Sequence, residues 1–165
     1  LDDVMSANVH TLYSERVALR KLLATADLVV GAVLIPGAVC PKLVTREMLS
    51  IMQPGAVIVD VAVDQGGCCE TIRPTTHESP TEIIDNIVHY GVTNMPGAVG
   101  RTSTFALTNA TLPYALKLAD MGYGEACKKN QGLAGGINIE RGKVTNRAVA
   151  EAFGFEFVPA SVARA

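Results

Sequence analysis

The chain has 165 residues, of which 48% are hydrophobic and 18% charged, as in a folded α/β protein and unlike a disordered one. Its net charge of -2 argues against nucleic acid or an anionic membrane surface as a partner. The longest apolar run, residues 28–36, has the length of a strand and contains a glycine, so no membrane span is predicted.

The first predicted elements are a short strand containing Val9, Leu12 and Tyr13, and a helix over residues 15–24. Ser14 suits the N-cap of this helix. Apolar residues recur at helical spacing on one face of it: Leu19, Leu22, Leu23 and Ala26.

Three further apolar runs predict buried strands, at residues 27–33, 56–64 and 87–92. A short helix starting at Thr45 separates the first two, and a longer polar crossover separates the last two. This order is typical of a doubly wound parallel sheet. The carboxyl ends of parallel strands meet at one edge of the sheet, where α/β proteins bind their ligands.

From residue 99 the pattern becomes helical. A helix is expected from Thr102 to Ala119, with a kink or restart at Pro113 and a stop at Gly122. A weak hairpin around Arg141-Gly142 and a last helix over residues 145–153 follow. We therefore expect two regions, a partial nucleotide-binding domain over residues 1–98 and a helical region over residues 99–165.

The run of residues 56–64 ends on an acid, Asp64, which Gln65 and two glycines follow. A carboxylate at the end of a parallel strand, beside flexible backbone, is placed to meet a substrate. A loop acid that caps the next segment is an equally good interpretation of Asp64 taken alone.

A dinucleotide-binding fold needs a glycine-rich turn, because only glycine lets backbone N–H groups approach the pyrophosphate. No Gly-x-Gly-x-x-Gly occurs in the sequence. The chain therefore has the pattern of the second half of a Rossmann-type fold. Its four cysteines have neither zinc nor redox spacing, so no metal site is expected and reduced, cytoplasmic thiols are favoured.

Six motifs in a fixed order carry a resemblance to a known family. They are ADLVVGAVLIPG (26–37), PKLVT (41–45), VDVAVDQGG (59–67), RPTT (73–76), NMPGAV (94–99) and RTSTFALTN (101–109). Together they resemble the family of alanine dehydrogenases and nicotinamide nucleotide transhydrogenase alpha subunits, over essentially the whole chain. Transhydrogenases typically have Ala-Gln-Asn-Gly-Gly and Asp-Leu-Pro-Gly-Arg at two of these places. Asp64-Gln65 and Asn94-Met95 match the alanine dehydrogenase choice.

The resemblance implies an NAD-dependent enzyme of L-alanine catabolism that reversibly converts L-alanine to pyruvate and ammonia. It implies a cytoplasmic homohexamer when intact, and a region 99–165 that returns to a substrate domain lying outside this sequence. It also implies that Asp64 is the catalytic acid or base, opposite a histidine of that domain; His89 and His77 are expected to be a packing and a loop residue. The positions that match NAD contacts are Ser14, Val33, Leu34, Val61, Ala62, Val63, Asp64, Arg73, Val92, Thr93, Asn94 and Met95.

Two alternatives remain open. The first is a transhydrogenase-type nucleotide-binding subunit, which would act with a membrane partner. The second is a fragment that binds a nucleotide or takes part in assembly without catalysing a reaction.

Overall fold

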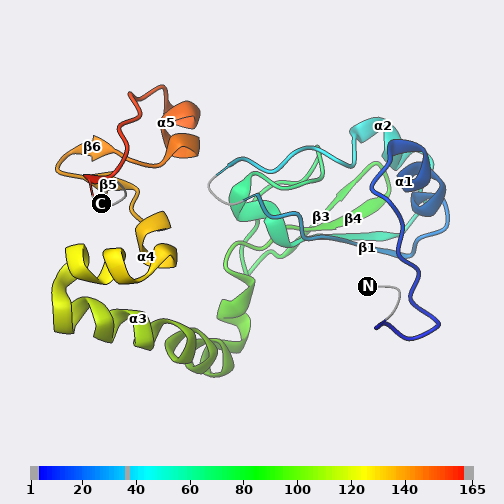
Figure 1. The fold of residues 1–165 in the computed structure, drawn as a ribbon. Helices are drawn as coiled ribbons and strands as arrows, with labels where there is room; N and C mark the ends of the chain where they lie inside the picture. Colours follow the sequence, from blue (N-terminus) through cyan, green and yellow to red (C-terminus); the bar gives the residue numbers. More distant parts are fainter. Residues whose placement is uncertain (1–3, 36–37, 162–165) are drawn as a thin grey trace. The chain divides into compact units, whose positions relative to one another are not determined.

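The computed structural model describes residues 4–35 and 38–161, and its chain divides into two compact units (Figure 1). The sheet unit comprises Leu1–Leu34 and Cys40–Thr93, and the helical unit comprises Ile35–Val39 and Asn94–Ala165. Each unit is described by itself.

The sheet unit is a mixed α/β structure, which confirms the predicted fold class. Its elements are α1 (Arg16–Leu23), β1 (Leu28–Gly31), α2 (Arg46–Leu49), β2 (Val57–Asp60), the 3-10 helix η1 (Val61–Gln65), β3 (Thr81–Ile84) and β4 (Ile87–Tyr90). The strand order is β1-β2-β4-β3, and β1, β2 and β4 are parallel. Their carboxyl ends therefore lie at the same edge of the sheet, as predicted.

Strand β3 lies in the crossover that the sequence analysis left without a strand. It pairs antiparallel with β4 through a tight turn, in which Asp85 and Asn86 both have positive φ angles of 50° and 64°. Two consecutive left-handed residues are typical of the two-residue turns that match the twist of a hairpin. The Asp-Asn pair between two short apolar runs was the signal that the sequence analysis missed.

Helices α1 and α2 lie side by side against one face of the sheet, where Arg20 of α1 forms an ion pair with Glu47 of α2 at 3.0 Å (Figure 1). The core between the helices and the sheet is apolar. Its fully buried members include Leu23, Met48, Leu49, Ile58 and Ile87. His89 is also buried and bonds Thr71 Oγ1 at 2.8 Å through Nε2, so its expected packing role is confirmed.

The other face of β1 is open, and the prediction of a fully buried first strand is wrong. Leu28 and Val30 are 57% and 58% exposed, whereas Val29 between them packs into the core. Successive side chains of a strand point to opposite faces of the sheet. In the described part of the chain the core cluster lies on one face only, so alternate residues of β1 remain exposed.

Two further expectations near the start of the chain are wrong. Residues 9–13 form no strand, and Ser14 does not cap α1. Glu15 occupies the N-cap position, without a capping hydrogen bond from its side chain. The apolar residues here are exposed, Leu12 at 62%, so this segment lacks the paired neighbour that a strand requires.

The helical unit contains η2 (Met95–Val99), α3 (Gly100–Lys129), α4 (Gln131–Gly135), β5 (Ile139–Glu140), β6 (Lys143–Val144) and α5 (Arg147–Phe153). The predicted hairpin and last helix are confirmed, and Gly154 ends α5 in a left-handed conformation. Helix α3 leaves helical geometry at Gly122, the predicted stop, while Pro113 lies inside it; α4 was not predicted. Among the described residues, no helix combines the length and apolar character that a membrane crossing needs.

Candidate functional site at the carboxyl edge of the sheet

The strand that was predicted to run to Asp64 ends four residues earlier, at Asp60. The chain then enters the 3-10 helix η1, because the Asp60 carboxylate accepts a hydrogen bond from the Ala62 N–H at 3.0 Å and caps the new helix. Gly66 ends η1 with a φ of 91°. Asp64 therefore lies on a helical turn beyond the edge of the sheet.

Asp60 is the structural acid of this segment. Its side chain is fully buried, and Oδ2 accepts hydrogen bonds from the N–H groups of Cys68 at 2.8 Å and Cys69 at 2.9 Å. A buried carboxylate needs such donors to offset its loss of hydration. The sequence analysis missed this role, although an acid inside the apolar run VIVDVAV is its signal.

The thiol of Cys68 shares this buried environment. Its Sγ lies 3.6 Å from Asp60 Oδ1. Burial, followed by the nearby Asp60 carboxylate and Cys40, raises the pKa of Cys68 from 9.0 to about 12. The thiol is therefore held protonated and donates to Asp60.

Asp64 differs from Asp60 in its exposure and in its hydrogen bonding. Its side chain is exposed, and within residues 4–35 and 38–161 it makes no hydrogen bond or ion pair. The loop-capping role that was one interpretation of Asp64 belongs to Asp60 instead. The carboxylate of Asp64 is left available to a substrate.

The ends of β1 and β2 come together around a small apolar cluster. Val33, which follows β1, packs with Ala62 of η1 against Cys40 and Cys68. The Cys40 N–H also donates to the Gln65 carbonyl at 3.0 Å. Two groups of predicted site residues, 33–34 and 61–64, therefore belong to adjoining segments. Leu34 and Val61 are left 67% and 51% exposed.

The end of β4 adjoins the segment that carries Arg73. Thr75 donates its N–H to the Gly91 carbonyl at 2.8 Å, and Thr93 donates to the Thr75 carbonyl at 3.2 Å. A Cβ atom at Gly91 would lie 2.4 Å from the Arg73 carbonyl, so only glycine fits there. Val92 is fully buried, and the exposed Arg73 lines a pocket of about 480 Å³ with Arg46 and Glu70.

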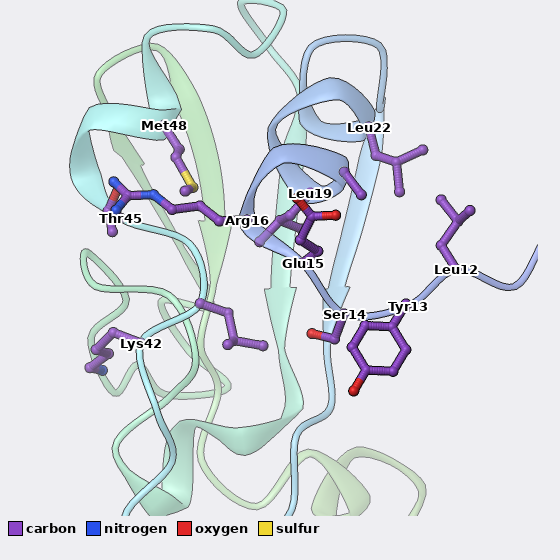
Figure 2. Close-up of a pocket in the computed structure, with 12 residues that line it drawn as sticks. Leu12, Tyr13, Ser14, Glu15, Arg16, Leu19, Leu22, Lys42, Thr45 and Met48 are labelled. Carbon is purple, nitrogen blue, oxygen red and sulfur yellow. The ribbon is translucent and has the colours of Figure 1, made fainter.

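The three remaining predicted positions lie on other segments of the chain. Ser14 lines a separate pocket of about 360 Å³, together with Leu19 of α1 and Met48 of α2 (Figure 2). Asn94 and Met95 belong to the helical unit, where Asn94 has a left-handed φ of 54°.

Lys42 is a further residue that the sequence analysis did not assign. It precedes α2 and lines the pocket of Figure 2. Its Nζ donates to the carbonyls of Gly66, Gly67 at 2.9 Å and Cys69 at 3.3 Å. The turn that follows Asp64 is thus held by a cation as well as by the Asp60 carboxylate.

A parallel sheet whose strand ends gather an exposed acid, a glycine turn and apolar side chains defines an α/β domain of the nucleotide-binding type. Residues 1–147 match the family model described as "Alanine dehydrogenase/PNT, C-terminal domain", and the chain belongs to this family of oxidoreductases.

The chain is similar to whole enzymes of this family over part of their length. It is 56% identical to the alanine dehydrogenase of Halomonas elongata, covering 98% of this chain and 43% of the relative, and 55% identical to alanine dehydrogenase 2 of Staphylococcus aureus, covering 95% and 42%. A solved L-alanine dehydrogenase matches with a TM-score of 0.77 at 46% identity, over 93% of this chain and 42% of that structure. A transhydrogenase from Sinorhizobium meliloti matches with a TM-score of 0.61 at 25% identity, over 81% and 36%. The chain thus spans about two fifths of the length of the curated relatives.

Proposed function

We propose that the chain supplies the nicotinamide-facing part of an NAD-dependent alanine dehydrogenase, which interconverts L-alanine with pyruvate and ammonia. The observation that carries this proposal is that two acids of the same segment have different surroundings. Asp60 is buried and holds the loop, whereas Asp64 is exposed and unpaired among the described residues. An acid that makes no structural contact among the described residues, at the edge of a parallel sheet, is placed to act in catalysis.

The residues at this edge fit the nicotinamide end of the cofactor. Leu34 and Val61 offer exposed apolar surface, as a planar ring requires. The Oε1 atom of Gln65 is buried and has no hydrogen-bond partner in the described part of the chain, so it would accept from an amide donor only after its side chain turned outward. The 165 residues contain no glycine-rich turn for the pyrophosphate, so the fit is to this end alone.

We infer that the predicted site residues act in two groups. Val33, Leu34, Val61 and Thr93 would bound the cofactor at the strand ends, with the buried Ala62, Val63 and Val92 supporting them from behind. By the family resemblance, Ser14, Arg73, Asn94 and Met95 would contact its other parts. NAD held at this edge would supply the acceptor for the hydride that leaves the α-carbon of alanine. Asp64 would accept the proton that the amine loses and release it to solvent before water attacks the imine carbon. It would then accept a proton from that water and return it to the nitrogen, which leaves as ammonia while the new hydroxyl loses its proton to solvent and becomes the carbonyl of pyruvate.

The family resemblance extends this proposal beyond the chain. It places the second proton-transfer group, a histidine, and the substrate-binding residues outside these 165 residues. A cytoplasmic homohexamer and a division at residue 98 are part of the same proposal. Because the substrate would be oriented by residues outside the chain, we expect the 165-residue chain by itself to show no alanine-dependent formation of NADH.

A transhydrogenase role is the second candidate. It is less favoured because hydride exchange between two nucleotides needs no proton donor, whereas amine oxidation does. The higher identity to the solved L-alanine dehydrogenase, 46% against 25%, also supports the first candidate.

The test requires an enzyme of full family length. We define the fusion enzyme as the N-terminal part of the Halomonas elongata relative, up to the start of its match, joined to this chain. We expect the fusion enzyme to oxidise L-alanine with NAD. Asp64→Asn should lower kcat by about two to four orders of magnitude, the usual worth of a positioned acid or base.

Binding of NADH to the Asp64→Asn fusion enzyme, measured by fluorescence on the same preparation, should change little. The variant keeps the size of the side chain and removes its charge and its basic oxygen. Near-normal turnover of the Asn variant would remove Asp64 from the mechanism. An inactive parent fusion enzyme that nevertheless folds would contradict the alanine dehydrogenase proposal itself.

A further inference from the structure

Two charged side chains hold the loop of residues 61–69 by opposite kinds of backbone group. The Asp60 carboxylate accepts three N–H groups, those of Ala62, Cys68 and Cys69. The Lys42 ammonium donates to three carbonyls, those of Gly66, Gly67 and Cys69. The anion binds N–H groups and the cation binds carbonyl groups of the same loop. Together they fix the orientation of its peptide units.

The part of the loop that Lys42 holds is the part with the weakest conformational preference. Gly66 and Gly67 have φ angles of 91° and 73°, in the left-handed region. Glycine enters this region freely but also leaves it freely, because it lacks a Cβ atom. The backbone bonds of this turn are Gly66 N–H to Val63 and Gly67 N–H to Ala62, at 3.0 and 2.9 Å. Without the cation, its carbonyls lose their charged donor.

Asp64 is the next-to-last residue of η1, and Gln65 separates it from this turn. Its side chain has no hydrogen bond or ion pair in the described part of the chain, so its direction depends on the backbone that carries it. That backbone is bounded by the Asp60 cap on one side and by the Lys42 contacts on the other. A change in the glycine turn would therefore move the Asp64 carboxylate.

We propose that Lys42 is a positioning residue, which sets the direction of the Asp64 carboxylate by holding the carbonyls of Gly66 and Gly67. This inference deepens the proposed function and rests on it. Lys42 touches neither the substrate nor the cofactor in this account. Its effect on the reaction is transmitted by the backbone of the turn.

The test is a double-mutant cycle in the fusion enzyme, with Lys42→Met and Asp64→Asn alone and combined. Lys42→Met keeps the aliphatic stem and removes the ammonium. A misplacement of about 1 Å in a catalytic group costs up to roughly hundredfold, so we expect kcat to fall by about tenfold to hundredfold while the KM for NAD changes less than about threefold. In the Asp64→Asn background, Lys42→Met should lower kcat by less than about twofold further.

Two control variants bracket the result. Lys42→Arg restores a cation with several donors and should recover most of the lost kcat. Lys21→Met removes an exposed lysine from α1 and should leave kcat unchanged. An equal loss of kcat for Lys42→Met in both Asp64 backgrounds would show that Lys42 acts independently of Asp64 and would overturn the proposal, as would an unchanged kcat.

A second measurement does not depend on turnover. In the 165-residue chain, Lys42→Met should speed amide hydrogen exchange at Gly66 and Gly67 by at least about tenfold and leave the amides of β2 unchanged. Unchanged exchange at the two glycines would show that Lys42 does not hold the turn, even if the fusion enzyme were inactive. The parent fusion enzyme could prove inactive while Lys42→Met still speeds exchange at the two glycines. That outcome would contradict the proposed function and leave the contacts of Lys42 with the glycine turn supported.

Discussion

The two units of the chain treat their apolar side chains in opposite ways. The sheet unit buries large residues such as Leu23, Leu49 and Ile58 in one continuous core. The buried apolar residues of the helical unit are small: Ala126, Cys127, Ala150 and Ala160. Many of its large ones are exposed, including Phe105 at 60%, Leu107 at 66%, Leu116 at 53% and Phe153 at 71%.

Helix α3 explains this difference. Phe105, Leu112 and Leu116 recur on one of its faces, and Leu107 and Leu118 lie on another. A helix with apolar residues on all sides is normally buried in a larger protein. The sheet unit is thus stabilised by contacts within itself, whereas the helical unit carries surface of the kind that a partner covers. The following predictions test this contrast.

The largest effect is expected in the buried polar network of the sheet unit. Asp60→Ala would leave three N–H groups, those of Ala62, Cys68 and Cys69, without their acceptor. At about 1–3 kcal/mol for each unsatisfied buried donor, the free energy of unfolding should fall by roughly 3–9 kcal/mol.

The matched control is Asp64→Ala, which removes an exposed and unpaired carboxylate and should change the free energy by less than about 0.5 kcal/mol. Urea unfolding, monitored by amide hydrogen exchange, measures the free energy of unfolding of each unit separately. Equal costs at the two aspartates would contradict the assignment of the structural role to Asp60 alone.

Asp60 and Asp64 also show how much of this part of the fold could be predicted from the sequence. The apolar run and the glycine pair correctly indicated a parallel strand that ends in a turn, because strand propensity and breakers are local properties. They did not indicate where the strand ends. That point depends on the hydrogen bonds from Cys68 and Cys69, eight and nine residues further on, to Asp60. Lys42 was missed for the same reason, since its acceptors lie 24 to 27 residues away.

A second prediction compares one substitution in a helix of each unit. Leu49→Ala in α2 removes a side chain that is 1% exposed and should cost about 2–5 kcal/mol, because a cavity is left in a packed core. Leu116→Ala in α3 removes one that is 53% exposed and should cost less than about 0.5 kcal/mol in the same chain. Similar costs, measured by urea unfolding, would show that α3 packs in solution as tightly as α2.

A third prediction uses the buried thiol of the sheet unit. The pKa of Cys68 is about 12 in the folded chain and 9.0 for an ordinary cysteine. Above pH 9 the unfolded chain loses this proton while the folded chain keeps it, so stability falls as the pH rises from 9 towards 12. The limiting slope for one proton is about 1.4 kcal/mol per pH unit.

Cys68→Ala should remove this contribution, so the stability of the variant should decline less steeply over the same pH range. Parallel pH profiles for the parent chain and Cys68→Ala would contradict the raised pKa.

The smallest effect on stability is expected on the exposed face of α3, where the readout is binding instead. Leu112 and Leu116 are 49% and 53% exposed and lie one helical turn apart. The double variant Leu112→Gln with Leu116→Gln keeps residues of good helix propensity and should change the free energy of unfolding by less than about 1 kcal/mol. It should lower both the binding of a hydrophobic dye and the self-association of the 165-residue chain, because each depends on exposed apolar surface. Leu28→Gln on the exposed face of β1 is the control in the sheet unit, since Leu28 is 57% exposed but stands outside the α3 surface. If the parent chain is a monomer that binds no dye, the helical unit covers its own apolar side chains in solution, and the contrast between the two units fails.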